Sequence, residues 1–288
     1  MGSGSWSEAS YSAYSRSVGA SYDSSTKRVS GQSFKSVKID PSLDPKKFLI
    51  RECVNSPEHP NTVPVILALD VTGSMGRSCS ETAAALGVIM TNLYKKYKDI
   101  EFCVMGIGDL AYDDAPIQMS QFESDVRIAE ALDKIYMEHG GGGNSYESYT
   151  AAWYMGLNRT KLDAVDNQNR KGIIITMGDE PLNPYLPCYE LNKCAAAHEQ
   201  GSNIETPDLY KEASKKFDIY HIAVEDKDNS FRRWKDDIME TFGKTLGDRL
   251  KVSTVNNLAN TIEACIDESM NGCSGQSCMV NENSEISW

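Results

Sequence analysis

This chain contains six apolar runs of strand length, and segments with helical periodicity lie between most of them. Runs such as 63–71 are continuously apolar, which is typical of strands buried on both faces of a parallel sheet. Parallel strands need crossover connections, and helices usually supply them. The runs lie at 63–71, 101–108, 117–122, 172–177, 218–224 and 250–255, and the third is expected to be an edge strand.

The segments between these runs carry the periodicity of amphipathic helices. In 80–97, for example, Ala84, Leu86, Val88, Ile89 and Leu93 recur at helical spacing. The predicted fold class is therefore α/β, a Rossmann-like, doubly wound, mostly parallel six-stranded sheet with helices on both faces. In such sheets ligands bind at the carboxyl ends of the strands. The expected helices span 80–97, 126–137, 145–157, 206–217, 231–242 and 257–270.

Composition divides the chain into four parts. Residues 1–36 contain 13 serines and almost no aliphatic side chains, so we expect a disordered tail that is dispensable for folding. Residues 37–61 hold four prolines and are expected to form a lead-in segment that covers an edge of the domain. Residues 62–270 form the predicted domain, and 271–288 a polar C-terminal tail.

Charge and cysteine content restrict the partners. The net charge of −12 argues against nucleic acid or an anionic membrane as the partner. The chain has no apolar run of 18 residues or more, and its eight cysteines are irregularly spaced, so we expect a cytoplasmic protein with reduced thiols. Cys188, Cys194 and His198, or Cys273 with Cys278, are the alternative, a zinc site.

Three oxygen-bearing side chains lie at alternate positions, beginning at the carboxyl end of the first predicted strand. They are Asp70, Thr72 and Ser74, in the sequence Asp-Val-Thr-Gly-Ser. Mg²⁺ prefers hard oxygen ligands of this kind. The alternative is a strand-to-helix turn in which Thr72 or Ser74 only caps the next helix.

Two further segments favour the metal site. A glycine loop at 140–143 leads through Asn144, Ser145 and Tyr146 to Glu147, and Asp179 follows the buried run 172–177. If the first and fourth strands are neighbours, the carboxylates and hydroxyls of these segments converge at one edge of the sheet. The predicted metal ligands are Asp70, Thr72, Ser74, Glu147 and Asp179.

These motifs resemble those of a known family. Asp70-x-Thr72-Gly-Ser74 resembles the D-x-S/T-x-S signature of the metal-ion-dependent adhesion site (MIDAS) of von Willebrand factor A (vWA) domains, and Thr176-Met-Gly-Asp179 is similar to the strand-end aspartate of that site. The resemblance spans about residues 62–270. Most vWA domains use a threonine from the glycine loop. Here Glu147 is the better match, similar to the glutamate of integrin β-subunit relatives.

The resemblance implies a binding module rather than an enzyme. Thr72 and Ser74 would bind Mg²⁺, or else Mn²⁺ or Ca²⁺, through their hydroxyls, and Asp70 and Asp179 would bind it directly or through water. An Asp or Glu of a protein partner would complete the coordination. Intracellular vWA proteins work as adaptors, with MoxR-type AAA+ ATPases or in bacterial stress and conflict systems, which suggests a similar setting. The oligomeric state is not indicated.

Aromatic and amide side chains near the predicted ligands are candidates for the partner-binding rim. Tyr146, Asn144 and Tyr185 are assigned to it because they flank the glycine loop or follow the fourth strand. Tyr149 and Trp153 lie four residues apart, share a helical face and are predicted to be core residues.

The alternative function is a phosphoaspartate phosphohydrolase of the haloacid-dehalogenase class. In that hypothesis Asp70 is the nucleophile, and Asp179 with Glu180 binds Mg²⁺. The glycine loop and Glu147 would have no role in such an enzyme. The acidic loop at 109–114 is interpreted as solvated, with a second cation site as the alternative.

Overall fold

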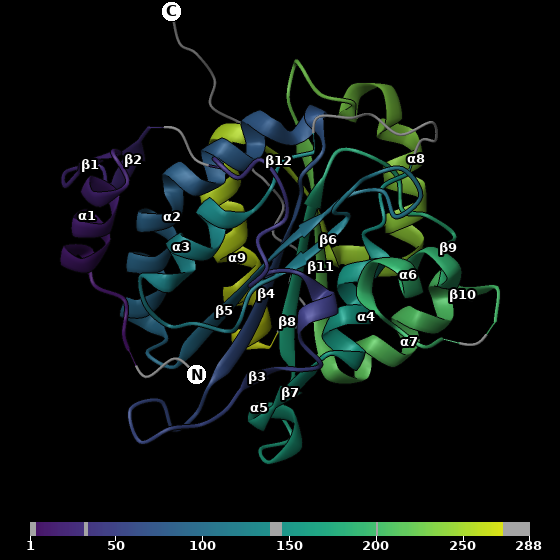
Figure 1. Ribbon diagram of the computed structural model, residues 1–288, viewed down its shortest axis with the longest axis horizontal. Coiled ribbons are helices and arrows are strands. Elements are labelled where there is room, and N and C mark those ends of the chain that lie inside the picture. Colours follow the sequence, from purple (N-terminus) through teal and green to yellow (C-terminus); the bar gives the residue numbers. More distant parts are fainter. Residues whose placement is uncertain (1–3, 32–33, 139–145, 200, 273–288) are drawn as a thin grey trace, which may run out of the picture.

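The computed structural model describes residues 4–31, 34–138, 146–199 and 201–272 (Figure 1). Its centre is a six-stranded sheet in the order β12-β11-β8-β4-β5-β6. All neighbouring strands are parallel except β6, which pairs antiparallel with β5 at the edge of the sheet. The mixed α/β fold with a mostly parallel sheet is therefore confirmed. The strands are β4 (Val63–Asp70), β5 (Ile100–Ile107), β6 (Ile117–Met119), β8 (Gly172–Gly178), β11 (Phe217–Glu225) and β12 (Leu250–Thr254).

Helices cover both faces of this sheet. All eight residues of β4 are buried, and alternate side chains of the strand enter two separate hydrophobic clusters. One cluster includes α2 (Gly76–Lys96), α3 (Arg127–Lys134) and α9 (Leu258–Asn271). The other includes α4 (Thr150–Asn158), α7 (Thr206–Lys216) and α8 (Phe231–Leu246), on the opposite side of the sheet (Figure 1).

The predicted ends of the strands and helices agree with the structure to within a few residues. One difference affects a predicted site residue. The helix expected over 145–157 begins only at Thr150. Before it, Glu147 forms an isolated parallel bridge with Leu182, in the loop after β8. This backbone pairing holds Glu147 in an extended segment, so the prediction of a helical Glu147 is wrong.

Several short elements lie outside the central sheet. The lead-in segment lies along the β6 edge, where the Leu43 carbonyl accepts a hydrogen bond from the Met119 amide at 2.9 Å. Of the predicted C-terminal tail, only Asn271 and Gly272 are described. The short elements are α1 (Glu8–Ser17), β1 (Ser21–Asp23), β2 (Arg28–Ser30), β3 (Arg51–Cys53), β7 (Thr160–Leu162), α5 (Asp163–Asp166), β9 (Tyr185–Pro187), α6 (Cys188–Ala195) and β10 (Asn203–Glu205), besides four 3-10 turns.

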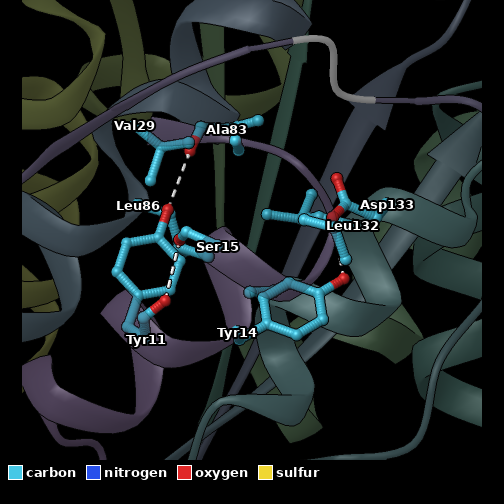
Figure 2. Close-up of a pocket in the computed structure, with 11 residues that line it drawn as sticks. Tyr11, Tyr14, Ser15, Val29, Ala83, Leu86, Leu132 and Asp133 are labelled. Atoms are coloured by element: carbon cyan, nitrogen blue, oxygen red, sulfur yellow. Dashed lines mark hydrogen bonds between the residues drawn. The ribbon is translucent and has the colours of Figure 1, made fainter. Parts of the chain in front are cut away.

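The prediction of a disordered N-terminal tail is wrong for residues 4–31. This N-terminal segment forms α1 and the β1-β2 hairpin and lies beside α2 and α3 (Figure 1). Tyr11 is only 3% exposed and Trp6 is also buried. Figure 2 shows Tyr11 and Tyr14 pointing toward these two helices, where the Tyr11 hydroxyl donates to the Ala83 carbonyl at 3.4 Å and that of Tyr14 to Asp133 at 2.7 Å. A few aromatic side chains on one helical face thus outweigh the serine-rich composition.

Gly87, within α2, allows the N-terminal segment to pack closely. A Cβ atom at this position would lie 2.3 Å from the Lys27 carbonyl oxygen and 2.8 Å from a ring carbon of Tyr11. Alanine normally stabilises a helix interior by about 1 kcal/mol relative to glycine. We expect Gly87→Ala to lose this gain and to loosen the N-terminal segment, so that trypsin cleaves faster near Arg16 and Lys27.

The matched control for this prediction is Gly243→Ala in α8, where a Cβ atom would meet nothing within 4 Å. That variant should raise the free energy of unfolding and leave the digestion pattern unchanged. A Gly87→Ala protein with the same gain in stability and the same resistance to trypsin would contradict the packing described above.

Two sequence expectations concern the membrane and the cysteines. In the described part of the chain, no helix is long and apolar enough to cross a membrane. The six cysteines within the described ranges are free thiols, and five of them are buried. Cys273 and Cys278 lie outside the described residues.

Candidate metal centre

The loop from β4 to α2 places three of the predicted ligands. Asp70 ends β4 and is fully buried, and its Oδ1 accepts hydrogen bonds from the Thr72 amide at 3.0 Å and the Thr72 hydroxyl at 2.6 Å. The Ser74 hydroxyl lies 3.4 Å from that of Thr72, in the 3-10 turn Gly73–Met75. Neither Thr72 nor Ser74 caps α2 through its side chain. The alternative of a simple capping loop is therefore wrong.

Asp179 joins the same group from the neighbouring strand. β8 pairs directly with β4, as the convergence of the two loops required. The Ser74 hydroxyl donates to Asp179 Oδ1 at 3.1 Å, and the Ser230 amide, just before α8, donates to Oδ2 at 2.6 Å. Two hydrogen-bonded pairs, Asp70 with Thr72 and Ser74 with Asp179, therefore meet at the carboxyl edge of the sheet, where the two hydroxyls lie 3.4 Å apart.

Tyr149 is a site residue whose role sequence reasoning missed. It is fully buried, as predicted, but its hydroxyl donates to Asp70 Oδ2 at 2.8 Å and accepts from the Glu180 amide at 3.3 Å. The ring packs against Gly178, where a Cβ atom would lie 1.9 Å from the tyrosine oxygen. Two signals could have indicated this: a buried tyrosine needs a hydrogen-bond partner, and a glycine stands directly before Asp179.

Glu147 is buried beside the group. The residue is 5% exposed, and its Oε2 has no hydrogen-bond partner within the described part of the chain. Burial, followed by the charges of Asp70, Glu180, Asp113 and Asp109, raises the pKa of Glu147 to about 11. An unpaired buried carboxylate oxygen is costly, and a cation is the group that would compensate it.

The environment also raises the pKa values of the other carboxyl groups at the site. Burial and then the neighbouring Asp179 raise the pKa of Asp70 to about 8, although hydrogen bonds from Thr72 and Tyr149 oppose the shift. Burial also raises the pKa of Asp179, and together with Asp179 and Asp109 it raises that of Glu180 to about 7. A cluster of carboxyl groups with few basic side chains nearby favours the binding of a cation.

The donor set fits a hard divalent ion only when its hydroxyls are counted. Among the described residues, no three His, Cys, Asp or Glu side chains converge closely enough to hold a metal by themselves. This excludes a zinc cluster of Cys188, Cys194 and His198. A site at Asp70 therefore depends on the Thr72 and Ser74 hydroxyls as ligands, which suits Mg²⁺ rather than zinc.

The acidic loop after β5 lies closer to this site than expected. Asp109 is buried, and its amide donates to Asp113 Oδ2 at 2.7 Å. The interpretation of 109–114 as a solvated loop is therefore wrong for Asp109, which is buried and whose charge raises the pKa values of Glu147 and Glu180. It holds for Ala111, Tyr112 and Asp114, which are exposed.

Two of the three predicted rim residues line one pocket beside the site. Tyr146 and Tyr185 are 40% and 42% exposed, and both border a cavity of about 280 Å³. Tyr146 directly precedes Glu147, so this cavity adjoins the candidate metal centre. Asn144 lies outside the described residues, as does the glycine loop 140–143.

No protein-family model matches the sequence, and no curated protein matches it. Solved structures give low similarities. The pilus adhesin SpaC from Lactobacillus rhamnosus GG in its open conformation has 12% identity and a TM-score of 0.47, and the match covers 75% of this chain and 31% of that chain. The vWF domain of the type V pili tip protein Mfa5 from Porphyromonas gingivalis has 12% identity and a TM-score of 0.44, with 75% and 98% covered.

Proposed function

We propose that this chain is a protein-binding module of the vWA type, with a doubly wound sheet and a MIDAS at its carboxyl edge. The observation that carries the proposal is the convergence of the buried Asp70, Thr72 and Asp179 with the half-buried Ser74, joined by short polar contacts. The unpaired oxygen of Glu147 supports it, because a buried carboxylate oxygen of this kind calls for a positive partner.

In this function each residue of the group has a separate role. The Thr72 and Ser74 hydroxyls would bind Mg²⁺ directly, and the Asp70, Asp179 and Glu147 carboxylates would bind it directly or through water, with Mn²⁺ or Ca²⁺ as other candidates. The Tyr149 hydroxyl orients Asp70, and the Ser230 amide orients Asp179. When bound, the cation supplies an open coordination position that attracts an Asp or Glu of a protein partner.

A binding role accounts for Asp70 better than nucleophilic attack does. Both of its carboxylate oxygens already accept hydrogen bonds, and the residue is fully buried. A phosphoaspartate enzyme needs this carboxylate in direct contact with its substrate, whereas a metal site can hold its cation through a water molecule. We therefore propose no catalytic activity and expect no turnover of a phosphate ester.

The setting follows from the family resemblance alone. We propose that the module acts in the cytoplasm as an adaptor for a larger machine, such as an AAA+ ATPase or a bacterial stress or conflict system. Its net charge of −12 disfavours nucleic acid and anionic membranes as partners.

Calorimetric titration with MgCl₂ tests the metal site directly. The unaltered protein should bind Mg²⁺, and Asp70→Ala should weaken binding by more than tenfold, since even residues behind the direct ligands typically contribute about 10- to 100-fold to metal affinity. Asp228→Ala is the matched control, because its carboxylate is largely exposed and pairs only with Lys227. Equal Mg²⁺ affinity in the Asp70→Ala and unaltered proteins, both with native circular dichroism, would refute the site.

A further inference from the structure

The cavity beside the candidate metal centre is built from aromatic, proline and acidic residues. It lies between the loop after β5, the segment before α4 and the loop after β8. We call it the tyrosine pocket. Its lining comprises Asp109, Ala111, Tyr146, Ser148, Asn183, Pro184, Tyr185, Pro187 and Glu190.

Two tyrosine rings are offered to solvent at this pocket. The side chains of Tyr146 and Tyr185 are 40% and 42% exposed, whereas aromatic residues such as Tyr149 and Trp153 are fully buried. Aromatic side chains left exposed beside a concave surface are typical of recognition sites.

The charge of the pocket selects among possible occupants. Glu190 contributes a half-buried carboxyl group, and no lysine or arginine occurs among the described residues that line the pocket. An apolar occupant would bury this carboxyl group without charge compensation, which is costly. A cationic side chain would pair with it and lie against the tyrosine rings.

We propose that the tyrosine pocket is a subsite for a lysine or arginine side chain of the protein partner. The identity of the occupant rests on the pocket alone. Its placement next to the partner's acidic residue rests on the proposed function, because Tyr146 and Ser148 flank Glu147 in the chain and join the two sites. The partner would then present a basic residue close to the acidic one.

Matched small probes test the pocket without knowledge of the partner. N-acetyl-arginine methylamide and N-acetyl-citrulline methylamide have nearly the same shape, but only the arginine compound is charged. Each is titrated into the ¹⁵N-labelled full chain in EDTA, and amide chemical shifts are followed by NMR. The arginine compound should bind at least threefold more tightly than the citrulline compound, with shifts at Ala111, Tyr146, Ser148 and Tyr185.

Substitutions test whether the proposed contacts cause the preference for the arginine compound. Tyr185→Ala should weaken arginine binding by about 2- to 5-fold, the range expected for an exposed cation–π contact, and Tyr185→Phe should restore it. Glu190→Gln should reduce the difference in affinity between the arginine and citrulline compounds. Tyr189→Ala is the control, since this exposed ring does not line the pocket.

Two results would overturn the assignment. One is equal binding of the two probes, which would indicate an apolar occupant. The other is a preference for arginine that Tyr185→Ala and Glu190→Gln leave unchanged, which would place the cation elsewhere. Neither result depends on Mg²⁺, so failure here and failure of the metal titration can be told apart.

Discussion

Replacing Gly178 with alanine should abolish measurable Mg²⁺ binding while most of the fold persists. The new Cβ atom would lie 1.9 Å from the Tyr149 hydroxyl oxygen and 2.4 Å from its Cζ, far inside contact distance. The tyrosine ring cannot easily move away, because it packs against the stacked rings of His221 and Phe242, with centroid distances of 5.0 and 5.6 Å. The strain must therefore displace the Tyr149 hydroxyl from Asp70 or shift the backbone that carries Asp179.

This prediction is checked by calorimetry and thermal unfolding together. Overpacking of a buried site typically costs about 1 to 3 kcal/mol, so the domain should still fold at room temperature. Gly76→Ala is the matched control, because it lies at the start of α2 near the same loop and its Cβ atom would meet nothing within 4 Å. Gly178→Ala with unaltered Mg²⁺ affinity would show that Tyr149 has no part in orienting the ligands.

Arg159→Leu should produce the largest loss of stability of any single substitution considered. Arg159 is 9% exposed, and its guanidinium donates to four backbone carbonyls: Phe48 at 3.3 Å, Leu49 at 3.1 Å, Ala196 at 3.2 Å, and Ala195. These carbonyls belong to the lead-in segment and to the end of α6. Leucine would remove all four hydrogen bonds from the charged guanidinium and leave the buried Ala195 carbonyl without a donor, at a cost of about 3 to 5 kcal/mol.

Urea denaturation measures this effect. The Arg159→Leu midpoint should fall sharply, and Arg159→Lys should recover only part of the loss because an ammonium group cannot reach both carbonyl pairs at once. Lys215→Ala serves as the control, since Lys215 forms an exposed ion pair with Glu212 and its removal should leave the midpoint nearly unchanged. If Arg159→Leu lowers the urea midpoint only slightly, water must replace the guanidinium as the hydrogen-bond donor to these carbonyls.

The central sheet was predictable because burial on both faces leaves a continuous apolar run. Such runs identified β4 and β8, and the rule that carboxyl ends of parallel strands share an edge brought Asp70 close to Asp179. The edge strand β6 was also found, although its antiparallel direction was not. These features depend on patterns that are local in the sequence.

Features that depend on contacts between distant segments were missed. Nothing near Glu147 in the sequence indicates its bridge to Leu182, so helix periodicity alone gave a wrong start for α4. The bond from Tyr149 to Asp70 joins residues 79 positions apart. Tyr11 looked like part of a solvated tail because the surface that buries it, on α2, exists only after the domain has folded.

The docking of the N-terminal segment also fixes an order of events during synthesis. Residues 4–31 leave the ribosome before the helices that receive Tyr11 and Tyr14, which end only at Lys96 and Lys134. At roughly 5 to 20 residues per second, about 5 to 25 seconds pass before that surface can exist. The segment therefore docks only after those helices are made, and during this interval the side chains of Tyr11 and Ser15, which are buried in the finished fold, are open to kinases, proteases and chaperones.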